Sequence, residues 1–177
     1  MFKVLTEGCE PTRGTKYSAC VDLYSIEDVA IGIGETKVVG LGVAINEEEL
    51  EKIIYENRGK SSIAFSTSFL NTHYLQVALR SSLGKEGLIM PNGVGIIDMD
   101  YRDEIKIIIH NPYKLDPTAY WGTDRDKADE VFRVKNTFTI NKGQRIAQIT
   151  LLEHKSELFC INSDVVRDGG FGSTGSN

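Results

Sequence analysis

Short runs of apolar and β-branched residues, separated by glycine-rich turns, dominate the chain. Segments 2–6 and 106–110 alternate apolar and polar residues, the second less regularly. Two longer runs, 38–45 and 146–152, are β-rich and mostly apolar. The chain contains 17 glycines, and many of them punctuate these runs. This pattern predicts an all-β sandwich or barrel.

One segment instead has the periodicity of an amphipathic helix. Asn46 is placed to cap its start, and Glu49 follows three residues later, as in a capping box. Further acidic residues fill the first turn, where the helix dipole favours negative charge. The apolar residues of one face follow at helical spacing: Leu50, Ile53 and Ile54. An Arg-Gly pair then ends the pattern, so we expect a short helix near 47–57.

The length favours a single domain over 1–177 that is large enough for a hydrophobic core. Within it, two segments look like insertions between strands. The first, 47–68, joins the helix to a serine-rich run, and the second, 112–133, contains Trp121 and a mixed-charge run. A solvated excursion from the core is the simplest interpretation of the second.

The C-terminal tail has the composition of a flexible arm. Four of its last eleven residues are glycine, which adds nothing to a core. A frayed terminus is one interpretation. The other is an arm, 163–177, that folds over a ligand, with Phe171 to stack and Arg167 to pair with phosphate.

Charge and cysteine content narrow the classes of function. The chain has 20 Lys+Arg against 25 Asp+Glu, so its net charge is −5, which argues against general nucleic-acid binding. No run reaches the ~18 apolar residues of a membrane helix, and the start turns polar too soon for a signal peptide. The three cysteines have neither an even number nor a CxxC spacing. We therefore expect a cytoplasmic protein, in the host cytoplasm if it is viral, with reduced cysteines and no nucleic-acid or membrane partner.

Candidate chemistry concentrates in the centre of the chain. Arg80-Ser81-Ser82 offers a cation and two hydroxyl donors beside a turn glycine, which suits a polyphosphate. Asp98 follows an apolar run, so it is either a satisfied structural acid or a general base. Asp22 stands inside an otherwise apolar strand, where acids are disfavoured, and it therefore needs a reason.

Five segments in order resemble the five motifs of the trimeric dUTP pyrophosphatase (dUTPase) family: 19–25, 80–84, 92–102, 143–148 and 169–175. Each is modest alone, but all five in the right order are highly specific. The resemblance implies a jelly-roll-like fold, a homotrimer and Mg²⁺. It also implies hydrolysis of dUTP to dUMP and pyrophosphate by in-line water attack at the α-phosphorus. This reaction keeps uracil out of DNA and supplies dUMP for dTMP synthesis.

The resemblance also implies individual roles. Asp98 matches the general base that activates the attacking water. Tyr101 matches the aromatic that packs under the deoxyribose and leaves no room for a 2′-hydroxyl. Asn92, with the backbone around Gly93, matches the group that reads the uracil edge. Asp22 matches the acid that holds the metal through water.

The remaining matches contact the base or the phosphates. Phe171 corresponds to the ring over uracil, and Gln148 to an amide that reaches the phosphates. The other substrate contacts implied are Arg80, Ser81, Ser82, Arg167, Gly172, Ser173 and Thr174. In this family three subunits share each site, and the arm closes over a neighbour's pocket. Two departures are Asp103, where the family usually has glycine, and the one-residue spacing between Arg167 and the Gly-Gly-Phe.

Two alternative functions remain at this point. A dCTP deaminase shares the fold, but it needs a glutamate ten residues after the position of Asp98, where this chain has Ile108. A regulatory protein-binding homologue, such as a phage-encoded one, would use the segments 47–68 and 112–133 to bind a protein partner. That role could coexist with catalysis.

Overall fold

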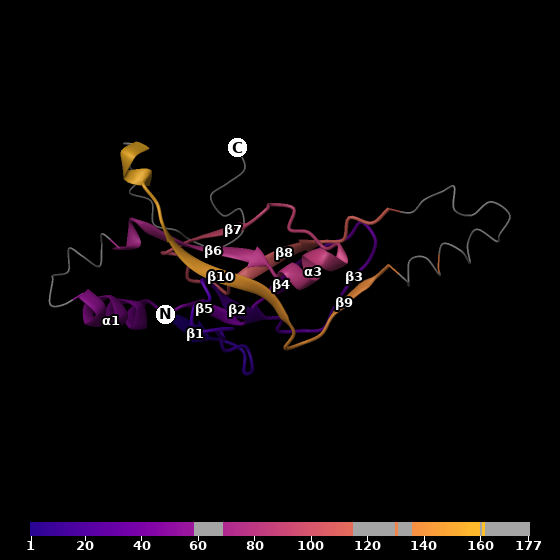
Figure 1. The fold of residues 1–177 in the computed structure, drawn as a ribbon, viewed down its shortest axis with the longest axis horizontal. Helices are drawn as coiled ribbons and strands as arrows, with labels where there is room; N and C mark the ends of the chain where they lie inside the picture. The colour runs from indigo at the N-terminus through magenta and orange to yellow at the C-terminus, as the bar shows by residue number, and fades with distance from the viewer. Residues whose placement is uncertain (59–68, 115–129, 131–135, 160, 162–177) are drawn as a thin grey trace.

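The computed structural model describes residues 1–58, 69–114, 130, 136–159 and 161. Short strands dominate this part, as the sequence predicts, and β10 crosses the middle of the molecule beside β6 (Figure 1). The elements in chain order are β1 (Phe2–Val4), β2 (Val21–Tyr24), β3 (Val29–Ile31), β4 (Thr36–Gly40), β5 (Val43–Ile45), α1 (Glu47–Arg58), β6 (His73–Leu79), α3 (Ser81–Glu86), β7 (Gly95–Asp98), β8 (Lys106–His110), β9 (Phe138–Ile140), β10 (Arg145–Glu153) and η1 (Ser156–Phe159).

The strands form one four-stranded antiparallel sheet and three antiparallel pairs. The large sheet has the order β2-β10-β6-β7, and the pairs are β1-β5, β3-β9 and β4-β8. Their inward faces meet in one core of aliphatic side chains, whose largest fully buried members include Leu23, Ile31, Leu75, Ile107 and Ile149. The all-β prediction is confirmed. Among the described residues, no helix is long and apolar enough to cross a membrane.

The apolar run 38–45 forms two strands, because its glycines let the chain bend between them. Gly42 has φ +67°, and a Cβ there would lie 2.8 Å from the Cβ of Cys9. Its N–H donates to Glu104 Oε1 at 2.9 Å, while the flanking Leu41 N–H bonds to the carbonyl of Ile105 at 3.0 Å. Only glycine meets both the left-handed backbone and the close approach of Cys9.

Helix α1 begins where the capping pattern predicts and ends one residue later than expected. The side-chain oxygen of Asn46 accepts the N–H of Glu49 at 3.2 Å, which is half of a capping box. The other half differs, since the Asn46 N–H donates to the carbonyl of Met1 at 2.8 Å. The Glu49 carboxylate pairs instead with the N-terminal ammonium at 2.9 Å, and this hydrogen bond holds the pKa of Glu49 below its ordinary value. Leu50 is buried, as the amphipathic pattern requires.

Several predicted features lie outside the described residues. They include 59–68 of the first segment that looks inserted, most of the second at 115–129 and 131–135, and the arm from 163 onward. Cys9 and Cys20 are free thiols, and burial raises the pKa of the Cys9 thiol. Cys160 is not described.

Candidate active site

The register of the large sheet places the main predicted site residues on one face. Asp22 pairs with Gln148 across β2 and β10, Gln148 pairs with Ala78 of β6, and Tyr74 of β6 pairs with Asp98 of β7. Directly opposed residues point to the same side of a sheet, as do residues four apart on one strand. Asp22, Gln148 and Asp98 therefore share the face opposite the core.

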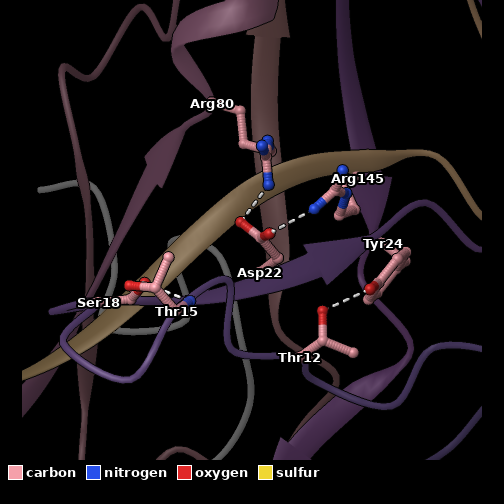
Figure 2. Close-up of polar contacts among 7 residues, drawn as sticks. All are labelled: Thr12, Thr15, Ser18, Asp22, Tyr24, Arg80 and Arg145. Atoms are coloured by element: carbon pink, nitrogen blue, oxygen red, sulfur yellow. Dashed lines mark hydrogen bonds and ion pairs between the residues drawn. The ribbon is translucent and has the colours of Figure 1, made fainter.

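Asp22 lies between two arginines at one end of this face (Figure 2). One carboxylate oxygen forms an ion pair with Nη1 of Arg80, and the other accepts a hydrogen bond from Nη1 of Arg145 at 3.2 Å. The Asp22 side chain is only 13% exposed, and a buried charge is costly unless it is paired. The two arginines supply this pairing and explain how an acid is accommodated within the strand. The three side chains carry a net charge of about +1, which favours an anionic ligand over a free cation.

The loop before β2 forms hydrogen bonds with the edge of that strand that β10 leaves unpaired. Thr12 and Asp22 exchange backbone hydrogen bonds of 3.2 and 2.7 Å, and the Thr12 hydroxyl lies 2.5 Å from the Tyr24 hydroxyl. Further along the loop, the Ser18 hydroxyl accepts the N–H of Thr15 at 2.9 Å (Figure 2). These contacts fix the strand that carries Asp22.

Arg80 stands at the junction of β6 and α3, with an extended backbone as the helix N-cap. Its N–H donates to the carbonyl of Ile146 at 2.9 Å, which ties the start of α3 to β10. Ser81 and Ser82 form the exposed first turn of α3. Gly84, expected at a turn, lies inside the helix, and Gly87 ends it with φ +107°.

Asp98 ends β7 at an exposed position and begins the turn to β8. The N–H of Tyr101 donates to the Asp98 carbonyl at 3.0 Å, and the Tyr101 hydroxyl donates to the Glu104 carbonyl at 3.1 Å. Tyr101 is only 7% exposed and belongs to the core cluster. Asp103, by contrast, is exposed.

The predicted base-reading segment precedes β7. The side-chain amide of Asn92 donates to the carbonyl of Val94 at 3.1 Å, and Gly93 between them has φ +73°. Asn92 and Gly93 are exposed. This local bond fixes the turn and leaves the backbone of Gly93 accessible.

Asp98 and the Asp22 cluster lie far apart within one chain. From β2 to β7 there are three strand spacings, and Ala78 and Tyr74 are four residues apart along β6. At about 4.8 Å per strand and 3.3 Å per residue, Asp98 is about 20 Å from Asp22. The predicted site residues that the structure describes thus form two separate groups on this face.

Sequence reasoning did not single out Arg145 as a site residue, although it lies in the segment 143–148. Its partner Asp22 is 123 positions away, so only the sheet register reveals the contact. Arg167, Phe171 and the arm residues Gly172, Ser173 and Thr174 lie outside the described residues. Among the residues that are described, no group of three or more His, Cys, Asp or Glu side chains could hold a metal ion.

Comparison with known proteins gives the family. No protein-family model matches the chain. The deoxyuridine 5′-triphosphate nucleotidohydrolase of Nautilia profundicola is 32% identical over 98% of this chain and 95% of its own length. The chain belongs to the dUTPase family. The dUTPase of Rickettsia canadensis is 30% identical over 95% of this chain and 89% of that relative.

Solved dUTPase structures share the fold. The dUTPase of Streptococcus mutans matches with a TM-score of 0.55 and 21% identity, covering 86% of this chain and 94% of that one. A mutant dUTPase from phage phi11 of Staphylococcus aureus, described with a structural Mg(II) ion, matches with a TM-score of 0.59 and 18% identity over 97% of both chains. The predicted family and its all-β fold are therefore confirmed.

Proposed function

We propose that this dUTPase hydrolyses dUTP to dUMP and pyrophosphate. The observation that carries the proposal is the shared sheet face. It presents an aspartate at one end and an arginine-rich cluster at the other, in a chain similar over nearly its whole length to dUTP nucleotidohydrolases. In the cell, this reaction keeps uracil out of DNA and supplies dUMP for dTMP synthesis. We place it in the cytoplasm, or in the host cytoplasm for a viral protein.

The chemistry needs a positioned water, neutralisation of the triphosphate charge and exclusion of solvent. Asp98 is the proposed general base, because its exposed carboxylate at a strand end can orient and deprotonate a water at the α-phosphorus. Arg80, with the hydroxyls of Ser81 and Ser82, binds phosphate oxygens. Gln148 lies on the same face and supplies an amide donor.

Selection of the nucleotide belongs to the segment around β7. Asn92 and the backbone of Gly93 read one edge of uracil. The methyl group of thymine excludes that base. Cytosine exchanges a hydrogen-bond acceptor for a donor, which would leave a buried polar group unpaired at a cost of roughly 1–3 kcal/mol. Tyr101 packs beneath the deoxyribose and excludes a 2′-hydroxyl, and Phe171 stacks over the base.

We propose the homotrimer that the family resemblance implies, and a site between subunits, because one chain keeps the two groups of site residues about 20 Å apart. A base must come within hydrogen-bond reach, about 2.6–3.2 Å, of the proton that it removes. Asp98 of one subunit must therefore meet the arginine cluster of another. The strip between them carries Ile96, 55% exposed, and the half-buried Tyr74, Ala78 and Leu152 beside the polar Gln76 and Thr150, a mixture that suits a surface covered by a neighbour. The arm 163–177, with Arg167, Gly172, Ser173 and Thr174 on the phosphates, then closes over a neighbouring site.

Mg²⁺ is the proposed cofactor, and a structural Mg(II) ion is described for the similar phage phi11 dUTPase mutant. Both carboxylate oxygens of Asp22 already contact guanidinium groups, so Asp22 is suited to hold the ion only through a water. Mg²⁺ commonly retains waters and binds mainly substrate phosphates, which fits a site without a carboxylate cluster. When bound, the ion neutralises charge on the phosphate oxygens.

A second candidate function is regulation through a protein partner. Similar structures include dUTPases of Staphylococcus bacteriophage 80alpha, described as controlling the transfer of virulence genes. Segments 47–68 and 112–133 are the proposed binding regions. A pull-down should compare wild type with a variant lacking 112–133 and recover a partner only with wild type. Identical partner sets would remove this role from that segment.

Pyrophosphate release with Mg²⁺ and four nucleotides tests the enzymatic proposal. Pyrophosphate should be released from dUTP alone. The nucleotides dCTP, dTTP and UTP serve as matched controls, because each differs from dUTP in one group of the base or the sugar. No pyrophosphate release from any of the four nucleotides would overturn the proposed hydrolysis and favour the regulatory role. Ammonia release from dCTP would identify a deaminase instead.

A further inference from the structure

Helix α1 begins beside the turn that carries Tyr101. In that turn, Nη1 of Arg102 donates to the carbonyl of Met99 at 2.7 Å. Nη2 of the same guanidinium forms an ion pair with Glu47 Oε1 at 2.9 Å. Glu47 is the first residue of α1, so one arginine joins the helix to the turn between β7 and β8.

The far end of this turn has its own anchor. The Glu104 carboxylate accepts the N–H of Gly42 at 2.9 Å, and its carbonyl accepts the Tyr101 hydroxyl at 3.1 Å. Tyr101 therefore lies between two fixed points. One is Glu104, which is bonded to Gly42 at the junction of β4 and β5. The other is Arg102, which is paired with Glu47.

Helix α1 is itself held firmly enough to serve as a support. Leu50 packs in the core with only 1% exposure. The residue before the helix, Asn46, bonds through its N–H to Met1, and Glu49 pairs with the N-terminal ammonium. The start of α1 thus has contacts to the core, to Met1 before β1 and to the turn after β7.

We propose that Glu47 is a positioning residue that acts through Arg102 to hold Tyr101 against the sugar of the nucleotide. The inference rests on the proposed function, in which Tyr101 excludes a 2′-hydroxyl. It gives the start of the first segment that looks inserted a role in substrate selection. The Arg102 and Glu47 side chains are 43% and 49% exposed, so salt screens their attraction and the effect is modest.

The test compares Glu47→Gln with Glu48→Gln as a matched control. Both variants remove one charge from the first turn of α1, so they share any effect on the helix dipole. The measured quantity is kcat/KM for dUTP divided by kcat/KM for UTP. We expect this ratio to fall about two- to fivefold in Glu47→Gln, the range of a partly exposed ion pair, and to stay at the wild-type value in Glu48→Gln. Added salt should bring wild type toward the Glu47→Gln ratio.

An Arg102→Gln background tests the route. There, Glu47→Gln should change the ratio no further, because its partner is already absent. Equal effects in both backgrounds, or an unchanged ratio in Glu47→Gln with a lowered Tm, would overturn the inference. If wild type fails to hydrolyse dUTP, the proposed function fails; if only the variants' ratios stay at wild type, this inference alone fails.

Discussion

Asp98 is the residue on which the proposed chemistry depends. Asp98→Asn keeps the shape of the side chain and its place at the end of β7, but it removes the proton acceptor. We expect kcat to fall by about 10²- to 10⁴-fold, the usual contribution of a general base. Binding of a non-hydrolysable dUTP analogue should change little, as titration calorimetry can measure. Near-normal turnover would remove Asp98 from the role of base.

A substitution at Gly42 tests the packing that supports the site. Gly42→Ala places a Cβ 2.8 Å from Cys9 on a backbone with φ +67°. We expect the free energy of unfolding in urea to fall by about 1–3 kcal/mol. Gly84→Ala is the matched control, since a Cβ there meets nothing within 4 Å inside α3. Equal stabilities of the two variants would contradict this account of Gly42.

At the level of residues, the sequence shows which positions are unusual but not what they contact. An acid within the apolar strand β2 marks Asp22 as special, and the family resemblance assigns it to the metal. Its contacts with Arg80 and Arg145 depend on pairings between segments far apart in the chain. Local patterns do not encode such pairings, so Arg145 emerged only from the folded sheet.

At the level of elements, the local signals predict most of the structure. Helix α1 follows from its cap, its acidic first turn and its apolar spacing, all of which act within one or two turns. The single apolar run 38–45 was a different case. Its apolar residues satisfy a strand pattern throughout, and the break at Gly42 depends on Cys9 and Glu104, which approach from other parts of the fold.

The turn between β3 and β4 allows a test of pH dependence. Glu35 contacts Nζ of Lys37 at 2.6 Å and accepts the N–H of Gly32 at 2.8 Å. The hydrogen bond from Lys37 is the main cause that lowers the pKa of Glu35 below its ordinary 4.5, and the Gly32 N–H adds to it. A carboxyl with a lowered folded-state pKa stabilises the protein above its unfolded pKa, and this contribution is lost as pH falls through the folded value.

We therefore expect wild type to exceed Glu35→Gln in stability at neutral pH. The difference should shrink as the pH falls below 4.5. Urea unfolding at a series of pH values measures both curves. A difference that stays constant into acid would show that the charge of Glu35 contributes nothing.

At the level of the whole molecule, the family resemblance predicted a shared site, and the sheet register supplies a physical reason for it. Asp98 and the arginine cluster occupy opposite ends of one sheet face. The separation of about 20 Å within one chain therefore supports the proposed site between subunits. The order of the motifs in the sequence does not reveal this separation, because the order is the same whether the site forms within one subunit or between several.

The most direct test of this account is activity from two inactive variants expressed together. Asp98→Asn lacks the base and Arg80→Ala lacks a phosphate contact, so each alone should hydrolyse dUTP poorly. In randomly mixed trimers, a site is complete when one subunit supplies Asp98 and its neighbour supplies Arg80, which gives about a quarter of wild-type activity. Recovery near that level is the result that we predict. No recovery from mixed, folded trimers would contradict a site shared between subunits.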